Sequence, residues 1–96
     1  MMTIDLTQYA PVISDEQTGI TIFKDIKNAI CHNNTIVIDM TGIKSMATFC
    51  AKQIFGQLYK ELGPNDFYSK IQIKNANDDI KVIIRMGIVS ALEGLH

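Results

Sequence analysis

The residues of this chain that could do chemistry gather around one short polar turn. Asp39 ends a β-branched run at residues 35–38, and Thr41 follows two positions later. A carboxylate at the end of a strand is typical of phosphoaspartyl enzymes, but these need further carboxylates to hold Mg²⁺. Position 41 is threonine, where such a site would need an acid. We therefore expect Asp39 to accept hydrogen bonds from amides near Gly42 and to stabilise the turn.

The cysteines and histidines show no spacing typical of a metal site or a catalytic group. We expect Cys31 and Cys50 to be free thiols, with Cys31 at a helix end, and His32 and His96 to lie on the surface. No glycine-rich loop follows a strand with the spacing of a phosphate cradle. Base, nucleophile and oxyanion donors are not assembled in the sequence, so we expect no enzymatic activity, no metal and no cofactor.

A strand and a helix position the polar turn. Residues 35–39 are apolar and uncharged up to their end, which is typical of a central strand buried on both faces. Ser45 could cap the next helix, and from there apolar residues recur with helical period over residues 47–62. Gly63 and Pro64 should end that helix. These elements form half of a βαβ unit.

The remaining segments alternate between strands and helices. Strands are expected at residues 3–6, 9–13 and 69–74, the last after a turn that begins at Pro64. A first helix should begin at a capping box that joins Ser14 to Gln17, and a last helix should begin after Asn77. An early glycine in the first helix, Gly19, suggests a close backbone approach to the sheet.

The order strand-strand-helix-strand-helix-strand-helix predicts an α/β fold with a single small mixed sheet and helices in the crossovers. The chain has 96 residues and no linker or repeat, so we assign residues 1–96 to one domain. The pattern leaves open whether the last helix continues through Gly87 or breaks there.

Charge and hydropathy exclude several classes of function. The net charge is −1, and the basic residues are scattered, whereas a nucleic-acid surface needs a basic stripe. No apolar stretch approaches the ~20 residues that span a bilayer. The first residues, MMTIDLTQYA, lack the basic and apolar regions of a signal peptide. We expect a cytoplasmic protein that binds neither nucleic acid nor membrane.

The segment TIVIDMTGIKSMATFCAKQIF resembles the signature of STAS domains, named for sulfate transporters and anti-sigma factor antagonists. In that family a strand ends in Asp-x-Ser/Thr-Gly and leads to an Asp-Ser-Ser-Gly turn that opens a helix. Residues 36–43 fit the first part. Residues 47–50, Ala-Thr-Phe-Cys, depart from the second part, so the serine that partner kinases phosphorylate falls on Phe49 and its acidic neighbour on Ala47.

This departure is similar to a divergent bacterial group of small STAS-like proteins, which share the early glycine at Gly19 and an asparagine at Asn75. The resemblance covers roughly residues 14–92. It implies a non-enzymatic regulatory module that docks a protein partner, such as a kinase-like ATP-binding protein or an anti-sigma-type regulator. Two alternatives stay open: a small-ligand or nucleotide-binding sensor module, and a subunit that forms a homodimer through its last helix.

The expected docking surface lies at the start of the central helix. Phe49 falls opposite the apolar arc of the helical wheel, in line with Gln53 and Gly56, so an aromatic ring and a glycine would form an exposed apolar dent. The alternative is that Phe49 folds under the loop and is buried. The partner-binding residues that we predict are Thr41, Ser45, Thr48, Phe49, Gln53 and Gly56.

Two further features bear on docking. Thr48 is the hydroxyl residue next to the position that is phosphorylated in relatives, which makes it the candidate phosphoacceptor, although the missing Asp and Ser argue against this role.

Val82, Met86 and Val89 lie on the last helix opposite its core-facing residues. A helix that is apolar on two faces is buried on both or covers a partner.

Overall fold

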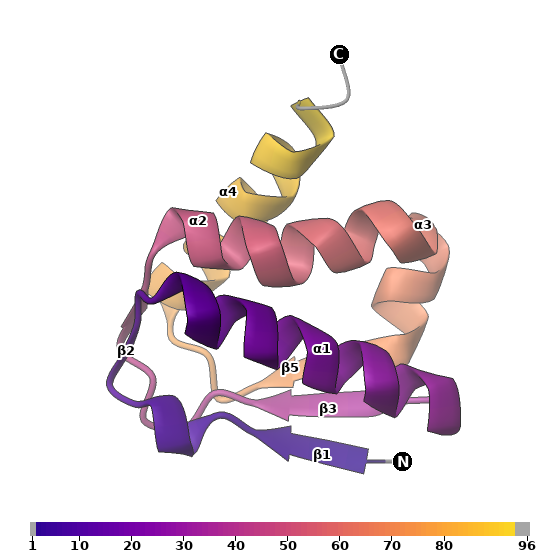
Figure 1. The fold of residues 1–96 in the computed structure, drawn as a ribbon, viewed down its shortest axis with the longest axis horizontal. Coiled ribbons are helices and arrows are strands. Elements are labelled where there is room, and N and C mark those ends of the chain that lie inside the picture. The colour runs from indigo at the N-terminus through magenta and orange to yellow at the C-terminus, as the bar shows by residue number, and fades with distance from the viewer. Residues whose placement is uncertain (1, 94–96) are drawn as a thin grey trace.

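Short parallel strands form the base of the fold in residues 2–93, which are the residues that the structure describes. The computed structural model gives the strands the bounds β1 (Met2–Asp5), β2 (Val12–Ile13), β3 (Ile36–Asp39), β4 (Ser45–Met46) and β5 (Ile71–Lys74). β3 lies between β1 and β5 in a three-stranded sheet, and β2 pairs with β4 (Figure 1). The predicted α/β class and central strand are confirmed. In place of the single mixed sheet that we expected, these strands form two sheets with parallel pairing.

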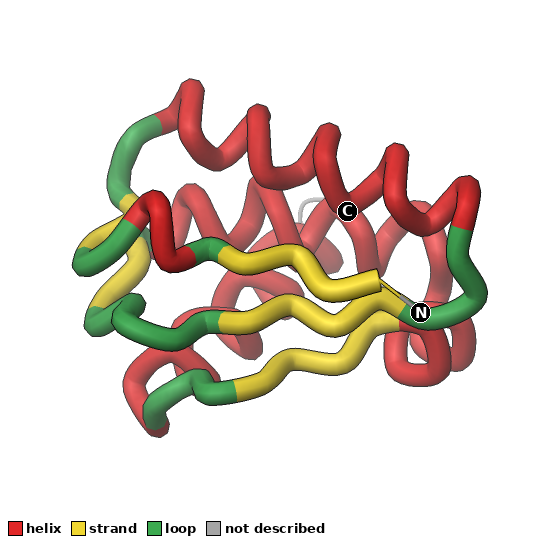
Figure 2. The backbone as a smooth tube through the Cα atoms, turned by 90° about the horizontal axis from the view of Figure 1, so that it is seen from below, coloured by secondary structure: helices red, strands yellow, loops and turns green. Residues whose placement is uncertain are grey.

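Helices cover one face of the three-stranded sheet. Their bounds are α1 (Glu16–His32), α2 (Thr48–Ala51), the π-helical turn η2 (Lys52–Gly56), α3 (Gln57–Lys70) and α4 (Asp78–Glu93), and a 3-10 turn η1 (Thr7–Tyr9) follows β1. Figure 2 shows the strands in front and the helices behind them. On the uncovered face Val37 is 3% exposed, because Thr3 and Gln72 flank it in register on the neighbouring strands. β3 is thus buried on both faces, as predicted.

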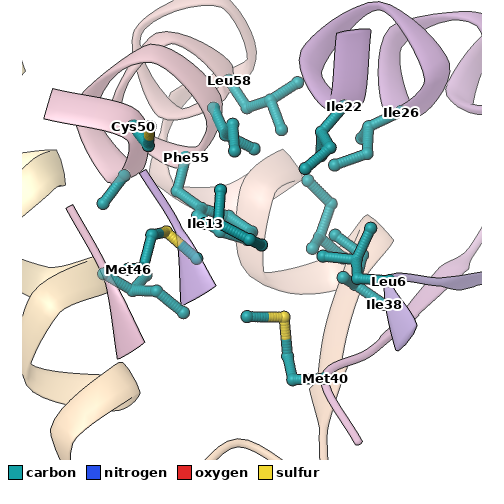
Figure 3. Close-up of a cluster of buried hydrophobic side chains, with 14 of the residues drawn as sticks. Leu6, Ile13, Ile22, Ile26, Ile38, Met40, Met46, Cys50, Phe55 and Leu58 are labelled. Atoms are coloured by element: carbon teal, nitrogen blue, oxygen red, sulfur yellow. The ribbon is translucent and has the colours of Figure 1, made fainter. Parts of the chain in front are cut away.

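The central helix, which runs through α2, η2 and the first part of α3, supplies the middle of the hydrophobic core. Phe55 lies among side chains from β3, α1 and the segment after β1 (Figure 3). The residues of the predicted apolar arc that are fully buried are Ala51, Ile54, Phe55 and Leu58. Ala47 and Leu62, at the ends of the arc, are partly buried against the same cluster.

The starts of two helices differ from our expectation. α1 is capped by Asp15, whose Oδ2 accepts a hydrogen bond from the backbone N–H of Thr18 at 3.0 Å, so Ser14 does not form the predicted capping box. Ser45 does not cap α2, because its pairing with β2 keeps it extended in β4. The N-cap residue of α2 is Ala47, which makes no side-chain hydrogen bond.

The chain bends at Gly63 inside α3. Gly63 has φ 82°, in the left-handed region that favours glycine, as predicted for a helix end. Instead of a turn, however, the chain resumes a helical path at Pro64 and continues to Lys70. Proline suits the first position of a helix, because its fixed φ matches and its missing N–H would have no intrahelical partner. The predicted strand at residues 69–74 therefore begins only at Ile71.

Two glycines allow the central helix and α4 to approach closely. A Cβ atom on Gly87 would lie 2.6 Å from the carbonyl carbon of Ala51, and one on Gly56 would lie 2.7 Å from the Cβ of Ala91. α4 is continuous through Gly87, which settles the alternative left open above. Our expectation that Gly56 is exposed was wrong. The wheel placed the core-facing arc correctly, but it could not show that α4 covers a second face of the central helix at Gly56.

Gly19 allows a similarly close approach between α1 and the central helix. A Cβ atom there would collide with Oε1 of Gln53 and lie 3.7 Å from Sγ of Cys50. The close approach that we inferred from this glycine is therefore made to the central helix and not to the sheet.

Replacing Gly87 with alanine should lower the free energy of unfolding by about 1–3 kcal/mol, although alanine favours helices by ~1 kcal/mol over glycine. The added methyl group would meet backbone atoms of Ala51 and Lys52. Gly19→Ala is the matched control, because the group in its way is the mobile end of the Gln53 side chain. We expect this second change to stay within ~1 kcal/mol of zero. Urea unfolding measures both, and a Gly87→Ala protein as stable as the parent would contradict the close crossing.

Candidate functional site

The turn after β3 is organised by the carboxylate of Asp39. Its Oδ1 accepts hydrogen bonds from the backbone N–H of Thr41 at 3.0 Å and from the Thr41 hydroxyl at 2.6 Å. It also accepts from Nδ2 of Asn75, which follows β5, at 3.0 Å. These bonds lower the pKa of Asp39, the Asn75 bond most, and the charge of Lys74 adds to the effect. The predicted role of Asp39 as an acceptor of turn hydrogen bonds is confirmed.

Neighbouring segments hold this turn from three sides. β1 ends in a similar way, since Oδ1 of Asp5 accepts from the backbone N–H of Thr7 at 2.8 Å and from the Thr7 hydroxyl, whose oxygen also lies 3.3 Å from the carbonyl oxygen of Thr41. The backbone N–H of Lys44 donates to the Pro11 carbonyl at 2.7 Å. Asn77 donates through Nδ2 to the Lys44 carbonyl and accepts through Oδ1 from the N–H of Ile80, so its predicted capping of α4 is confirmed. The turn is therefore fixed against the end of β1, the segment at Pro11 and the start of α4.

Four of the six predicted docking residues lie on the surface around this turn. Thr41, Ser45, Thr48 and Phe49 are all exposed. Phe49 is 50% exposed, which excludes the alternative that it folds under the loop. The hydroxyl of Thr41 is already bonded to Asp39, whereas Thr48 is the first residue of α2.

The other two predicted docking residues point inward. Gln53 is partly buried, and its Oε1 is shielded from solvent without a hydrogen-bond partner, close to Gly19. Gly56 is buried against Gly87 and Ala91 of α4. The apolar dent that we expected from Phe49 and Gly56 together is therefore absent.

A different apolar surface takes its place, formed by the start of α2 and the outer side of α4. Phe49, Val82 and Met86 are each 50% exposed and Val89 is 48% exposed. A hollow of about 420 Å³ joins the two helices, lined by Thr48, Arg85, Met86, Val89, Ser90 and Glu93. We call Thr48, Phe49, Val82, Met86 and Val89 the α2–α4 face; Thr48, Met86 and Val89 line its hollow, and Phe49 and Val82 are exposed outside it. The α4 part of this face was predicted from the sequence, and its junction with α2 was not.

A second hollow, beside the edge of β5, was missed by sequence reasoning. It has a volume of about 410 Å³ and lies between β5, the second half of α3 and α4. Its walls include Phe67 and Tyr68 and two basic residues of α4, Lys81 and Arg85. We call it the β5–α4 groove. The adjacent aromatic residues and the i, i+4 spacing of the basic pair were the available signals, but only the fold brings them together.

The remaining reactive groups form no further site in the part of the chain that the structure describes. Cys31 and Cys50 are free, as predicted, and burial raises the pKa of Cys50. His32 lies exposed in the last turn of α1, and His96 lies outside the described residues. Residues 2–93 contain no cluster of three or more His, Cys, Asp or Glu side chains able to hold a metal ion. Among their helices, none is long and apolar enough to cross a membrane.

The hydrogen bonds to Asp39 make a pH-dependent contribution to stability. Because its pKa is lower in the folded chain than the ordinary 3.8, the contribution is present above pH 3.8 and disappears as the pH falls through the folded-state value. Asp39→Asn should thus lower the melting temperature at pH 7, and the difference from the parent should shrink towards pH 3. Asp25→Asn is the control, because Asp25 is exposed on α1 and its side chain makes no hydrogen bond within residues 2–93. An equal loss for Asp39→Asn at both pH values would exclude this role of the charge.

Comparison with known proteins supports the resemblance drawn from the strand and turn. The model of the STAS-like domain of unknown function (DUF4325) matches residues 18–81. Comparisons with curated proteins and with solved structures find no match. The matched residues contain α1 from its third residue on, β3, the Asp39 turn, the central helix and β5. Since they make up well over half of the chain, the protein belongs to the family of this STAS-like domain.

Proposed function

We propose that this STAS-like domain is a non-enzymatic, cytoplasmic regulatory module that docks a protein partner through the α2–α4 face. The observation that carries the proposal is the exposure of Phe49, Val82, Met86 and Val89 on two helices packed against each other. The same helices bury their other apolar side chains in the core. Large apolar side chains grouped on one exposed surface are typical of protein interaction sites.

The composition of the face favours a protein as the bound molecule. Aromatic residues and methionine are enriched in the buried centres of protein interfaces, and Phe49 and Met86 supply one of each. Arg85 and Glu93 lie beside the apolar residues in the hollow and could form a polar rim. The pairing of β4 with β2 and the bond from the Ala47 N–H to the Ile13 carbonyl hold the start of α2 in place, so little ordering would be needed on binding.

The family resemblance supports the class of partner. In STAS domains the same end of the corresponding helix faces regulatory kinases, so we propose a kinase-like ATP-binding protein or an anti-sigma-type regulator. Thr48 stays a candidate phosphoacceptor because it is exposed at the first turn of α2. Since Ala47 and Phe49 replace the acidic residue and the serine of phosphorylated relatives, we propose that docking does not require phosphorylation.

Replacing Phe49 with alanine should weaken partner binding by ~2 kcal/mol or more, about thirtyfold in Kd, with little loss of thermal stability. To identify the partner, a photo-crosslinking amino acid at position 86 is compared with the same group at Lys24, an exposed residue of α1. Affinity for the purified partner is then measured by calorimetry for the parent and for Phe49→Ala. Tyr68→Ala removes an exposed aromatic ring outside the α2–α4 face and is the matched control.

Two results would contradict the proposal. A loss of about 3–5 kcal/mol of folding stability in Phe49→Ala would mean that the ring is a core side chain. Crosslinks from position 86 that join only copies of this chain, with a dimeric mass in solution, would instead assign the face to the homodimer.

A further inference from the structure

The β5–α4 groove shares Arg85 and Val89 with the docking site proposed above, but its other lining residues are separate from that site. Its size and lining are those of a ligand site. Its volume, about 410 Å³, is within the range of roughly 300–1,000 Å³ that is usual for small-molecule pockets. β5 pairs only with β3 in the described sheet, and Ile73 of β5 lines the groove. Most of the lining is apolar or aromatic, with few charged groups, as in small-molecule sites generally.

The apolar part of the groove has a floor and an aromatic wall. Phe67, Ile84 and Ile88 are nearly buried and form the floor. Tyr59 and Tyr68 each contact Phe67, with ring centroids 5.4 Å and 5.3 Å from its own. Tyr68 is nevertheless 68% exposed, so one side of this wall is free to contact another molecule. Such a surface would gain from burial against an alkyl or aryl group.

The charged part of the groove consists of two cations. Lys81 and Arg85 lie one helical turn apart on α4, and no Asp or Glu lines the groove with them. Within residues 2–93 neither side chain has a carboxylate partner, since the ion pair found there joins Lys27 to Glu61. The groove is therefore complementary to an anion. Guanidinium and ammonium groups together are well suited to a carboxylate.

Helix geometry sets the length of the molecule that fits. The lining continues from Arg85 along α4 to Leu92, a rise of roughly 10 Å at 1.5 Å per residue. The first two residues of α4, Asp78 and Asp79, do not line the groove, and the amides of Ile80 and Lys81 already bond to Asn77, so the helix start offers no amide to a phosphate here. We propose that the β5–α4 groove binds an elongated amphipathic carboxylate, such as a medium-chain fatty acid, with its headgroup at Lys81 and Arg85 and its chain directed towards Leu92.

Octanoate tests this proposal directly, with the whole chain and without the docking partner. In amide NMR titrations, octanoate should shift resonances of the groove residues in a saturable way and leave those around Phe49 nearly unchanged. Octylamine, with the same chain and the opposite charge, should bind at least tenfold more weakly, and acetate should give no saturable shift. Equal binding of octanoate and octylamine, or shifts scattered over the surface, would overturn the proposal.

Variants separate the two parts of the groove. Lys81→Ala with Arg85→Ala should weaken octanoate binding tenfold or more, whereas Lys24→Ala with Lys52→Ala removes the same charge from exposed positions that do not line the groove and should leave it unchanged. Tyr68→Ala should weaken octanoate binding severalfold through the apolar wall. Phe49→Ala should not affect it, so failure of this proposal and failure of protein docking are distinguishable. Unchanged binding in the double variant at Lys81 and Arg85 would exclude the headgroup site.

Discussion

The close crossing of the central helix and α4 determines much of this structure. At Gly56 and Gly87 the helices approach so nearly that a methyl group on either would meet atoms of the other. The crossing directs Ile80, Ile84 and Ile88 of α4 into the core. Since the helix has only one side towards the core, its opposite side must face outward. The packing therefore leaves the apolar residues of that outer side, Val82, Met86 and Val89, on the surface. Core formation does not explain why these positions are apolar.

The polar turn of Asp39 supplies a second constraint at the carboxyl end of the sheet. One carboxylate oxygen accepts from Thr41 and from Asn75, and thus joins the ends of β3 and β5. The backbone N–H of Leu6, directly after β1, donates to the carbonyl of Asp39 at 3.0 Å and connects the end of β1 to the same turn. Because the hydrogen bonds from Thr41 and Asn75 occupy the Asp39 carboxylate, its role is to accept hydrogen bonds that stabilise the fold. This end of the sheet is where α/β proteins usually place their sites, and here it positions the start of α2.

Local patterns were sufficient for the elements whose formation depends on neighbouring residues. The apolar run at residues 35–39, the capping by Asn77 and the turn chemistry of Asp39 could all be predicted, and the resemblance to STAS-like proteins followed from the same stretch. Errors arose where distant segments decide the outcome. Ser45 is extended because β2 pairs with it, and Gly56 is buried because α4 packs against it.

The proposed sites share part of α4. Arg85 and Val89 line both the hollow of the α2–α4 face and the β5–α4 groove. Neither the groove nor its connection with the face could be predicted from the sequence, because Tyr59, Phe67 and Lys81 meet only after α3 resumes beyond Gly63. Helical spacing alone, by contrast, identified Val82, Met86 and Val89. These three residues with Phe49 carry the functional account, so their exposure in solution is its central claim.

The methionine methyl groups allow the most direct test of that exposure. Met86 is 50% exposed on the α2–α4 face, whereas Met40 and Met46 are 0% and 2% exposed in the core. In a chain labelled with ¹³C at the methionine methyl groups, a soluble paramagnetic chelate should broaden the Met86 signal strongly at every protein concentration. The Met40 and Met46 signals should remain sharp. A Met86 signal as well protected as that of Met40 would contradict the account, because the face would then already be covered by this chain or by a second copy of it.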